Sequence, residues 1–219
     1  MDLLDAATGY AQHIHDGKRL KVDKGKYFTH VKAVSRRLWT KEEKVVALLH
    51  DVVEQRVKDK LGATPNPKEE EECIKEILFE IARYFKCCNL DVADLIPDID
   101  ILTKRVTDAN NYRGYIIRLA DDAKRRVAEN RPNPYRVIIV KLSDLHHNQE
   151  PDRNPAVSQQ SPKDKTRLGD YGWAIRYLEG EFPDVLMRTA KPPNRRFRRP
   201  RRPGDRPPKG KKAPLIRLP

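Results

Sequence analysis

The run Val137-Ile138-Ile139-Val140 most constrains the fold, because it is the one segment of the sequence that reads as a β-strand. Its β-branched residues favour a buried strand, but a short apolar run also suits a buried helix. A strand needs partners, and no second strand candidate occurs in the chain. We therefore expect an all-α fold in which residues 135–147 form a central buried helix.

Signals that start and stop helices divide most of the remaining sequence into segments of helical length. Asp2 is a suitable N-cap for a first helix, and Gly17 follows its expected end. Thr40 with Glu43 three residues later is a capping box, which predicts another helix start. The expected helices cover residues 2–15, 27–38, 41–55, 68–87, 98–104, 109–129, 135–147 and 163–180, with a basic loop at 18–26 and a polar loop at 148–161.

The net charge of +13 is concentrated at the C-terminal end of the sequence. Residues 188–219 hold thirteen Lys and Arg against one acid, a net charge of +12, and 8 of the 17 prolines. Residues 1–187 hold the other 32 basic and 31 acidic residues, a net charge of +1. Proline and repelling charges oppose helix formation, so we expect one folded domain at 1–187 and a disordered basic tail at 188–219.

The sequence carries no sign of export or membrane insertion. No apolar run approaches the length of about 20 residues that a membrane-spanning helix needs. The first five residues include two acids, where a signal peptide would be basic. Cys73, Cys87 and Cys88 fit neither a disulfide framework nor a zinc motif, so we interpret them as packing residues. We expect a cytoplasmic protein without a membrane partner.

Two adjacent polar residues, His50 and Asp51, follow the apolar segment 45–49. Imidazole and carboxylate are both good ligands for a divalent transition metal. Glu54 is four residues after His50 and lies on the same helical face, where a carboxylate could handle a water molecule. The alternative is a buried His–Asp pair that finishes a helix, and the motif alone does not decide between the two.

A second apolar segment carries Asp144, with Lys141 and Asn148 on the same helical stripe. A carboxylate in such a segment must be ion-paired, hydrogen-bonded or bound to a metal. His30 offers one further imidazole at the start of a short helix. Seen in isolation, His30 would more often be an ordinary core or surface histidine.

These segments together resemble the HD superfamily of helical-bundle hydrolases, and most closely the RelA/SpoT hydrolase domain and the small alarmone hydrolases. The resemblance covers roughly residues 5–180. Its longest motif is Ala47-Leu48-Leu49-His50-Asp51-Val52-Val53-Glu54, similar to A-L-L-H-D-V-V-E-D, and its second is Val140-Lys141-Leu142-Ser143-Asp144 through Asn148, similar to V-K-L-A-D-x-x-x-N. Further similar blocks are residues 11–30, 102–104 with Tyr112 and Tyr115-Ile116, Arg153, and 171–178.

The resemblance implies a metal-dependent phosphohydrolase. His30, His50, Asp51 and Asp144 would bind Mn²⁺ or another divalent metal. The family removes the 3′-pyrophosphate from guanosine tetra- or pentaphosphate, so the implied partner is a guanine nucleotide. Glu54 matches the first acid of the family's catalytic pair. Gln55 stands where the family has Asp, and a Gln side chain can orient a water molecule but cannot take its proton.

The same resemblance assigns six substrate-binding candidates. The basic loop would contact the nucleotide, and its charges could equally be ordinary solvated ones. Lys141 would serve the pyrophosphate and Asn148 the base or ribose, and both could instead be structural. The six candidates are Arg19, Lys21, Tyr112, Lys141, Asn148 and Arg153.

Two other functions stay open at the level of the sequence. The tail at 188–219 would attract RNA by counterion release, which suits an enzyme that strips pyrophosphate from modified tRNA. The tail could also be a solubilising appendage. Alternatively, Gln55 marks lost catalysis, and the chain is a degenerate HD protein that binds a nucleotide without cleaving it.

Overall fold

The computed structural model describes residues 1–18, 27–109 and 111–185, and over these residues the protein is all-α, without a strand. The predicted fold class is therefore confirmed. Arg19, Lys21 and the predicted tail lie outside the described residues. The helices are α1 (Leu3–His15), α2 (Phe28–Arg36), α3 (Lys41–Leu49), α4 (Val52–Leu61), α5 (Pro67–Cys87), α6 (Ile96–Leu102), α7 (Tyr112–Ala128), α8 (Arg136–Asn148) and α9 (Pro162–Glu181), with short 3₁₀ helices η1 (Val106–Asp108), η2 (Pro151–Arg153) and η3 (Val157–Gln159).

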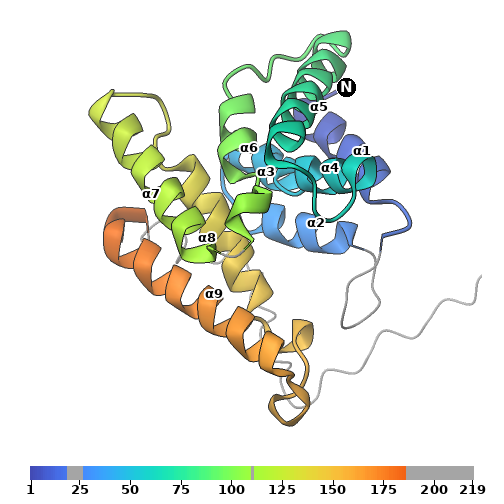
Figure 1. The fold of residues 1–219 in the computed structure, drawn as a ribbon. Coiled ribbons are helices and arrows are strands. Elements are labelled where there is room, and N and C mark those ends of the chain that lie inside the picture. The colour runs from blue at the N-terminus through green and yellow to red at the C-terminus, as the bar shows by residue number, and fades with distance from the viewer. Residues whose placement is uncertain (19–26, 110, 186–219) are drawn as a thin grey trace, which may run out of the picture.

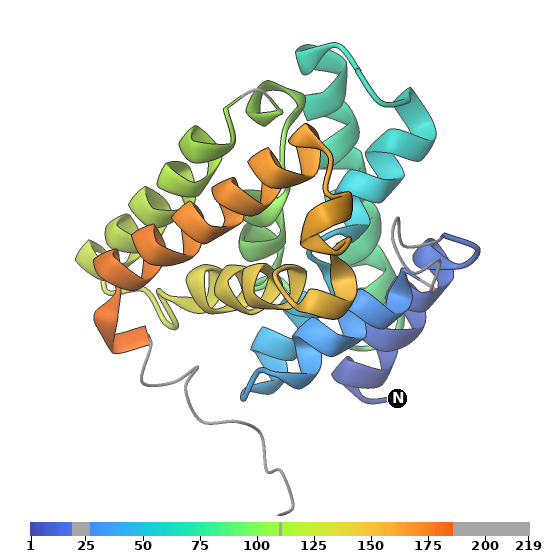
Figure 2. The same ribbon diagram turned by 90° about the horizontal axis from the view of Figure 1, so that it is seen from below.

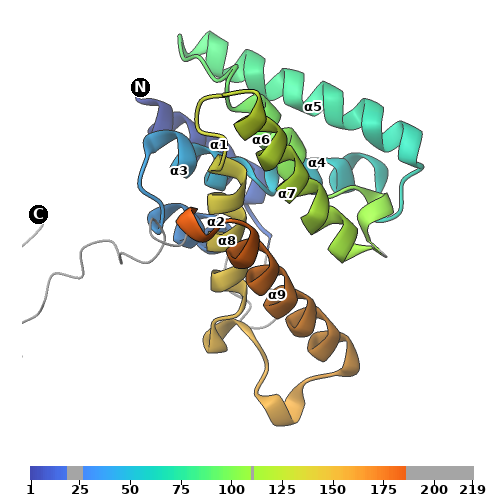
Figure 3. The same cartoon turned by 90° about the vertical axis from the view of Figure 1, so that its left-hand side faces the viewer.

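Helix α8 lies at the centre of the fold. It contacts α2, α3, α6, α7 and α9. In Figure 1, α7, α8 and α9 gather on one side and α1 to α5 on the other, with α6 between the two groups. Helix α9 runs alongside α7 and crosses α8 in Figures 2 and 3. Side chains of α8 therefore meet side chains from both halves of the molecule.

The ambiguous β-branched run is helical, as predicted. Residues 137–140 lie in the first half of α8, and Val137, Ile138 and Val140 are completely buried. Burial against five other helices overrides the weak strand preference of β-branched residues. Although α8 is largely apolar, neither it nor any other helix in the described part of the chain is long and apolar enough to cross a membrane.

The cap residues predicted from the sequence are confirmed at two helix starts. Asp2 accepts a hydrogen bond from the Leu4 amide at the start of α1. Thr40 and Glu43 form the reciprocal capping box at the start of α3. Each cap satisfies amide groups that have no partner inside their own helix.

One predicted helix is wrong. The segment 41–55 is not continuous, because α3 ends at Leu49 and α4 begins at Val52. The ring nitrogen Nδ1 of His50 lies 2.7 Å from the Ala47 carbonyl oxygen, a backbone group near the end of α3. A side chain that bonds a helical carbonyl competes with the continuing helix. His50 and Asp51 therefore lie at a joint between two helices.

Candidate metal centre

Four side chains from separate parts of the chain converge beside α8. His30 comes from α2, His50 and Asp51 from the joint between α3 and α4, and Asp144 from α8. The His30 Nε2 atom lies 3.1 Å from Asp144 Oδ1 and 3.8 Å from Asp51 Oδ2. The His50 Nε2 atom lies 3.2 Å from Asp51 Oδ2 and 3.8 Å from Asp144 Oδ1. The four predicted ligands are thus neighbours in space.

A subset of this group has the spacing of a metal site. His30, His50 and Asp51 each offer one ligand atom, and these atoms all lie within 4.8 Å of one another. Both imidazoles are buried. The three side chains could hold a metal ion.

The hydrogen bonds of His50 fit a metal ligand. Its Nδ1 is placed to donate to the Ala47 carbonyl, which leaves a lone pair on Nε2. Nε2 is buried and makes no hydrogen bond with any described residue. A buried nitrogen that accepts nothing is costly unless it binds something else, and a divalent cation is a suitable partner.

The charges around His50 also fit a cation site. Burial alone would lower the pKa of His50, but the carboxylates of Asp51 and Asp144 outweigh burial and raise the pKa to about 9. The two carboxylates that favour a proton on His50 would equally favour a metal cation beside its Nε2 atom. Metal binding would release that proton, because the ligand must be the neutral imidazole.

Polar neighbours fix the two carboxylates. The Tyr27 hydroxyl donates to Asp51 Oδ2 at 2.5 Å. The Lys141 ammonium donates to Asp144 Oδ2 at 3.0 Å, and the Asn148 amide donates to Asp144 Oδ1 at 2.7 Å. Burial would raise the pKa of Asp144, but Lys141 and the two histidines hold it well below its usual range. Burial would also raise the pKa of Asp51, but His50 and His30 lower it, so both aspartates are ionised and oriented.

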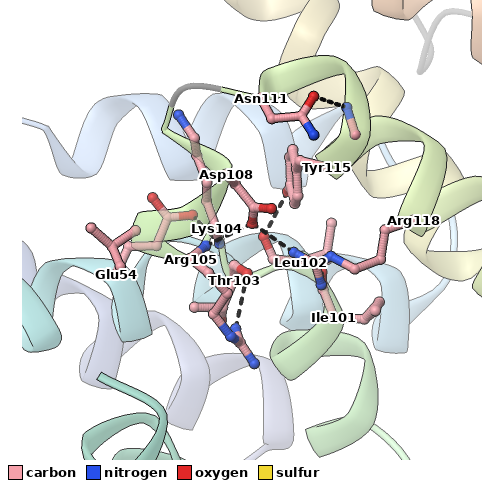
Figure 4. A network of polar contacts seen from close by, with 12 residues as sticks. Glu54, Ile101, Leu102, Thr103, Lys104, Arg105, Asp108, Asn111, Tyr115 and Arg118 are labelled. Atoms are coloured by element: carbon pink, nitrogen blue, oxygen red, sulfur yellow. Dashed lines mark hydrogen bonds and ion pairs between the residues drawn. The ribbon is translucent and has the colours of Figure 1, made fainter. Parts of the chain in front are cut away.

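Glu54 lies in the first turn of α4 and accepts a hydrogen bond from the Lys104 amide at 2.7 Å (Figure 4). This amide belongs to the segment between α6 and η1. Burial and the Asp51 charge raise the pKa of Glu54 to about 7. A carboxylate with such a pKa can take up and release a proton near neutral pH.

Gln55 does not supply a substitute acid. Its amide Nε2 donates to Asp59 Oδ1 at 2.9 Å, one turn further along α4. The same oxygen accepts a hydrogen bond from Lys18 at 2.7 Å. Gln55 and Asp59 both line the cavity described next, but the Gln55 amide is already engaged in its hydrogen bond to Asp59.

A cavity of about 580 Å³ adjoins these side chains. His30, Asp51, Glu54 and Asp144 line it, so three of the four candidate ligands and the candidate base are accessible from one space. A cavity of this size suits a small-molecule ligand. Its basic lining residues are Lys18, Lys58, Lys104, Lys141, Arg153 and Arg167.

The substrate-binding candidates divide into two groups. Tyr112, Lys141, Asn148 and Arg153 all line the cavity, so the structure brings them together with the metal group. Arg19 and Lys21 lie outside the described residues. The Tyr112 hydroxyl is buried and finds no hydrogen-bond partner among the described residues, which leaves it free to bind a ligand.

Three contacts of this site were not predicted from the sequence. Tyr27 had no expected role beyond its place in a motif, yet its hydroxyl orients Asp51. The Lys104 amide is a main-chain group and has no residue signature. The family resemblance predicts that His147 shapes the site without binding the metal, but it does not predict the contact with His30, whose Nδ1 atom lies 2.7 Å from that of His147.

Fold and site together define an all-α protein with a buried histidine–aspartate group that could hold a metal ion. Beside that group lie a carboxylate of neutral pKa and a cation-rich cavity. Neither a scan against models of protein families nor a search of curated proteins finds a match for this chain. The side chains themselves therefore carry the functional assignment.

Proposed function

We propose that this protein is an HD-type phosphohydrolase that removes the 3′-pyrophosphate from guanosine tetra- or pentaphosphate, or from a related nucleotide. The observation that carries the proposal is the convergence of His30, His50, Asp51 and Asp144 on one side of the cavity that Glu54 also lines. Two imidazoles and two carboxylates suit Mn²⁺ or another divalent ion. Such an ion would polarise a phosphoryl group and make a bound water more acidic.

Glu54 acts as the general base in this proposal. Its pKa of about 7 suits removal of a proton from the attacking water near neutral pH. The Lys104 amide holds one carboxylate oxygen, Oε1, and leaves Oε2 to receive the proton. The water oxygen bonds to the phosphorus that carries the 3′-oxygen, and the bond from that phosphorus to the 3′-oxygen breaks. The 3′-oxygen takes up a proton, and pyrophosphate is released.

Cationic side chains of the cavity bind the phosphates of the substrate. Lys58 and Lys104 have no carboxylate partner among the described residues, so their charges are available to a ligand. Lys141 is half-buried beside Asp144 and lines the cavity, so in this proposal it binds a phosphate oxygen near the metal group. The free hydroxyl of Tyr112 adds a neutral donor to these cations.

The direct test is to incubate the full chain with Mn²⁺ and guanosine tetraphosphate and to measure pyrophosphate and GDP. We expect both products in equal amounts, and none from the variant Asp144→Asn. His146→Gln is a matched control, because His146 lies on the same helix but pairs with Glu179 outside the cavity. Absence of product from this nucleotide and from other nucleotides with a 3′-phosphate or 3′-pyrophosphate would remove the proposal.

A nucleotide-binding protein without catalysis is the second candidate. The observation that favours it is the Gln55 amide, which bonds Asp59 and provides no acid. In that case guanosine tetraphosphate would bind in the cavity with Mn²⁺ and remain intact. Calorimetry of binding, run beside the pyrophosphate assay, separates this candidate from the hydrolase.

A further inference from the structure

The ring of His30 contacts a second imidazole on the side away from the aspartates. His30 Nδ1 lies 2.7 Å from Nδ1 of His147, which is on α8. The ring centroids are 4.9 Å apart and the rings are inclined by 22°. Because the nitrogens are much closer than the centroids, the rings meet edge to edge, as an N–H···N hydrogen bond requires.

One of the two nitrogens must donate, and Arg153 decides which. Its Nη1 atom lies 3.3 Å from the same His147 Nδ1. A guanidinium only donates, so His147 Nδ1 must present its lone pair. The proton of the contact between the imidazoles therefore belongs to His30 Nδ1, and His30 Nε2 is left to face Asp144 and Asp51.

The other edge of the His147 ring agrees with this arrangement. If Nδ1 carries the lone pair, Nε2 of the neutral ring carries the proton. Nε2 faces an acid, with the Glu150 Oε2 atom at 3.6 Å. Glu150 is in turn held by an ion pair with Arg37. The proton positions are thus consistent from Arg37 through to His30.

We infer that His147 and Arg153 are positioning residues, which fix the tautomer and the ring orientation of His30 so that its Nε2 lone pair points at the metal group. The inference rests on the metal centre of the proposed function, but not on the identity of the substrate. It also gives Arg153 a role besides that of a phosphate-binding cation. Hydrogen bonds to the outer nitrogen of a ligand imidazole typically change metal affinity by about 10–100-fold.

Calorimetric titration of the full chain with Mn²⁺ tests the inference without reference to turnover. His147→Phe removes the acceptor and should weaken Mn²⁺ binding by about 10–100-fold. His147→Asn offers an oxygen near the position of Nδ1 and should restore most of the affinity. His146→Asn removes the adjacent exposed histidine and should leave the affinity unchanged.

Variants at Arg153 separate the tautomer from simple packing. Arg153→Met keeps an extended apolar chain but no longer forces the lone pair onto His147, so Mn²⁺ binding should weaken. Arg153→Lys restores a donor and should recover part of the loss. Unchanged Mn²⁺ affinity in both His147→Phe and Arg153→Met would overturn the inference.

Nuclear magnetic resonance of the wild-type chain gives a readout that needs no variant to fold. With Zn²⁺ as a diamagnetic probe, the ring ¹⁵N shifts of His30 should show a protonated Nδ1 and a coordinated Nε2. Coordination through Nδ1, or a proton on His147 Nδ1, would refute the assignment. If Zn²⁺ binds as expected while none of the nucleotides is hydrolysed in the Mn²⁺ assay, the proposed hydrolase fails and this inference stands.

Discussion

The Glu54 carboxylate accepts a hydrogen bond from the Lys104 amide, a donor fifty residues later in the sequence (Figure 4). A main-chain donor holds the carboxylate without adding a full positive charge beside it. Burial and the neighbouring Asp51 charge can then keep the pKa of Glu54 near 7. This pair fixes the position of the proposed base while leaving it basic enough to act.

Replacing the proposed base should slow the reaction without weakening metal binding. We expect Glu54→Gln to lower kcat by about 10²–10⁴-fold, the usual contribution of a general base. The new side chain keeps an oxygen for the Lys104 amide, so Mn²⁺ affinity should change little. The wild-type rate should fall as the pH drops below about 7, because Glu54 becomes protonated. Equal rates for Glu54→Gln and wild type would exclude this role for Glu54.

Restoring the second acid should have a small effect. In Gln55→Asp, two carboxylates would face each other one helical turn apart, because Gln55 now bonds Asp59. We expect hydrolysis to change by less than about tenfold, since the metal and Glu54 do most of the activation. A large gain from a nearly silent parent, measured as pyrophosphate release, would favour the degenerate binding protein.

His15 should make the folded protein sensitive to acid. It is 1% exposed, and burial together with the nearby histidines and Lys18 lowers its pKa from 6.5 to about 4. The unfolded chain takes up a proton below pH 6.5 and the folded one does not, so stability is lost as pH falls from 6.5 to 4. At 1.36 kcal/mol per pKa unit, His15 should account for a loss of up to about 3 kcal/mol of unfolding free energy over this pH range.

Urea unfolding at pH 7 and pH 4.5 checks this expectation. Since Phe has no proton to bind, His15→Phe should lose less stability between the two pH values than wild type. His13→Gln, at an exposed position on the same helix, serves as the control. Identical pH dependence of His15→Phe and wild type would show that His15 is not the sensor.

The buried ion cluster at Asp98 should be costly to break. Asp98 is completely buried, bonds Arg126, and pairs with the Nε atom of Arg136 at 3.0 Å. Asp98→Ala leaves buried guanidinium charge uncompensated, so we expect a loss of about 3–5 kcal/mol of unfolding free energy. The exposed Asp94→Ala should stay within about 0.5 kcal/mol of wild type. Equal urea midpoints for Asp98→Ala and wild type would contradict this account.

Mn²⁺ should stabilise the fold by an amount that grows with the logarithm of its concentration above Kd. At a concentration of 100 Kd, a ligand that binds only the folded state adds about 2.7 kcal/mol. We expect Mn²⁺ to raise the Tm of wild type and of His146→Gln. Asp144→Asn should lose most of this increase, because it removes a carboxylate 3.1 Å from the His30 Nε2 atom. A Tm increase of the same size in Asp144→Asn would remove Asp144 from the ligand set.

Much of the helical fold could be predicted from local signals. Cap residues such as Asp2 and Thr40 act within one turn, so their effect is visible in a short stretch of sequence. The helical character of 137–140 was predictable only from the absence of partner strands. The joint at 50–51 was missed because it depends on the His50 side chain reaching the Ala47 carbonyl.

The candidate site was predictable where side-chain identity carries the chemistry. Histidine and aspartate in apolar segments indicated His50, Asp51 and Asp144 before any geometry was known. The local contacts of Asp144 with Lys141 and Asn148 follow from their shared helical stripe, whereas the contacts that join distant segments were not predictable. The Tyr27 hydroxyl reaches Asp51 across 24 positions, and the Nδ1 atoms of His30 and His147 meet across 117.

The joint between α3 and α4 has a mechanical consequence. Helix α3 packs mainly on α2 and α1, whereas α4 packs mainly on α5 and less on α1, so the His50–Asp51 doublet joins two helices with different main partners. An ion held there, together with His30 on α2 and Asp144 on α8, would lock four helices against one another. A substitution that disturbs the packing of α4 on α5, far from any candidate ligand, should therefore change the affinity for the ion.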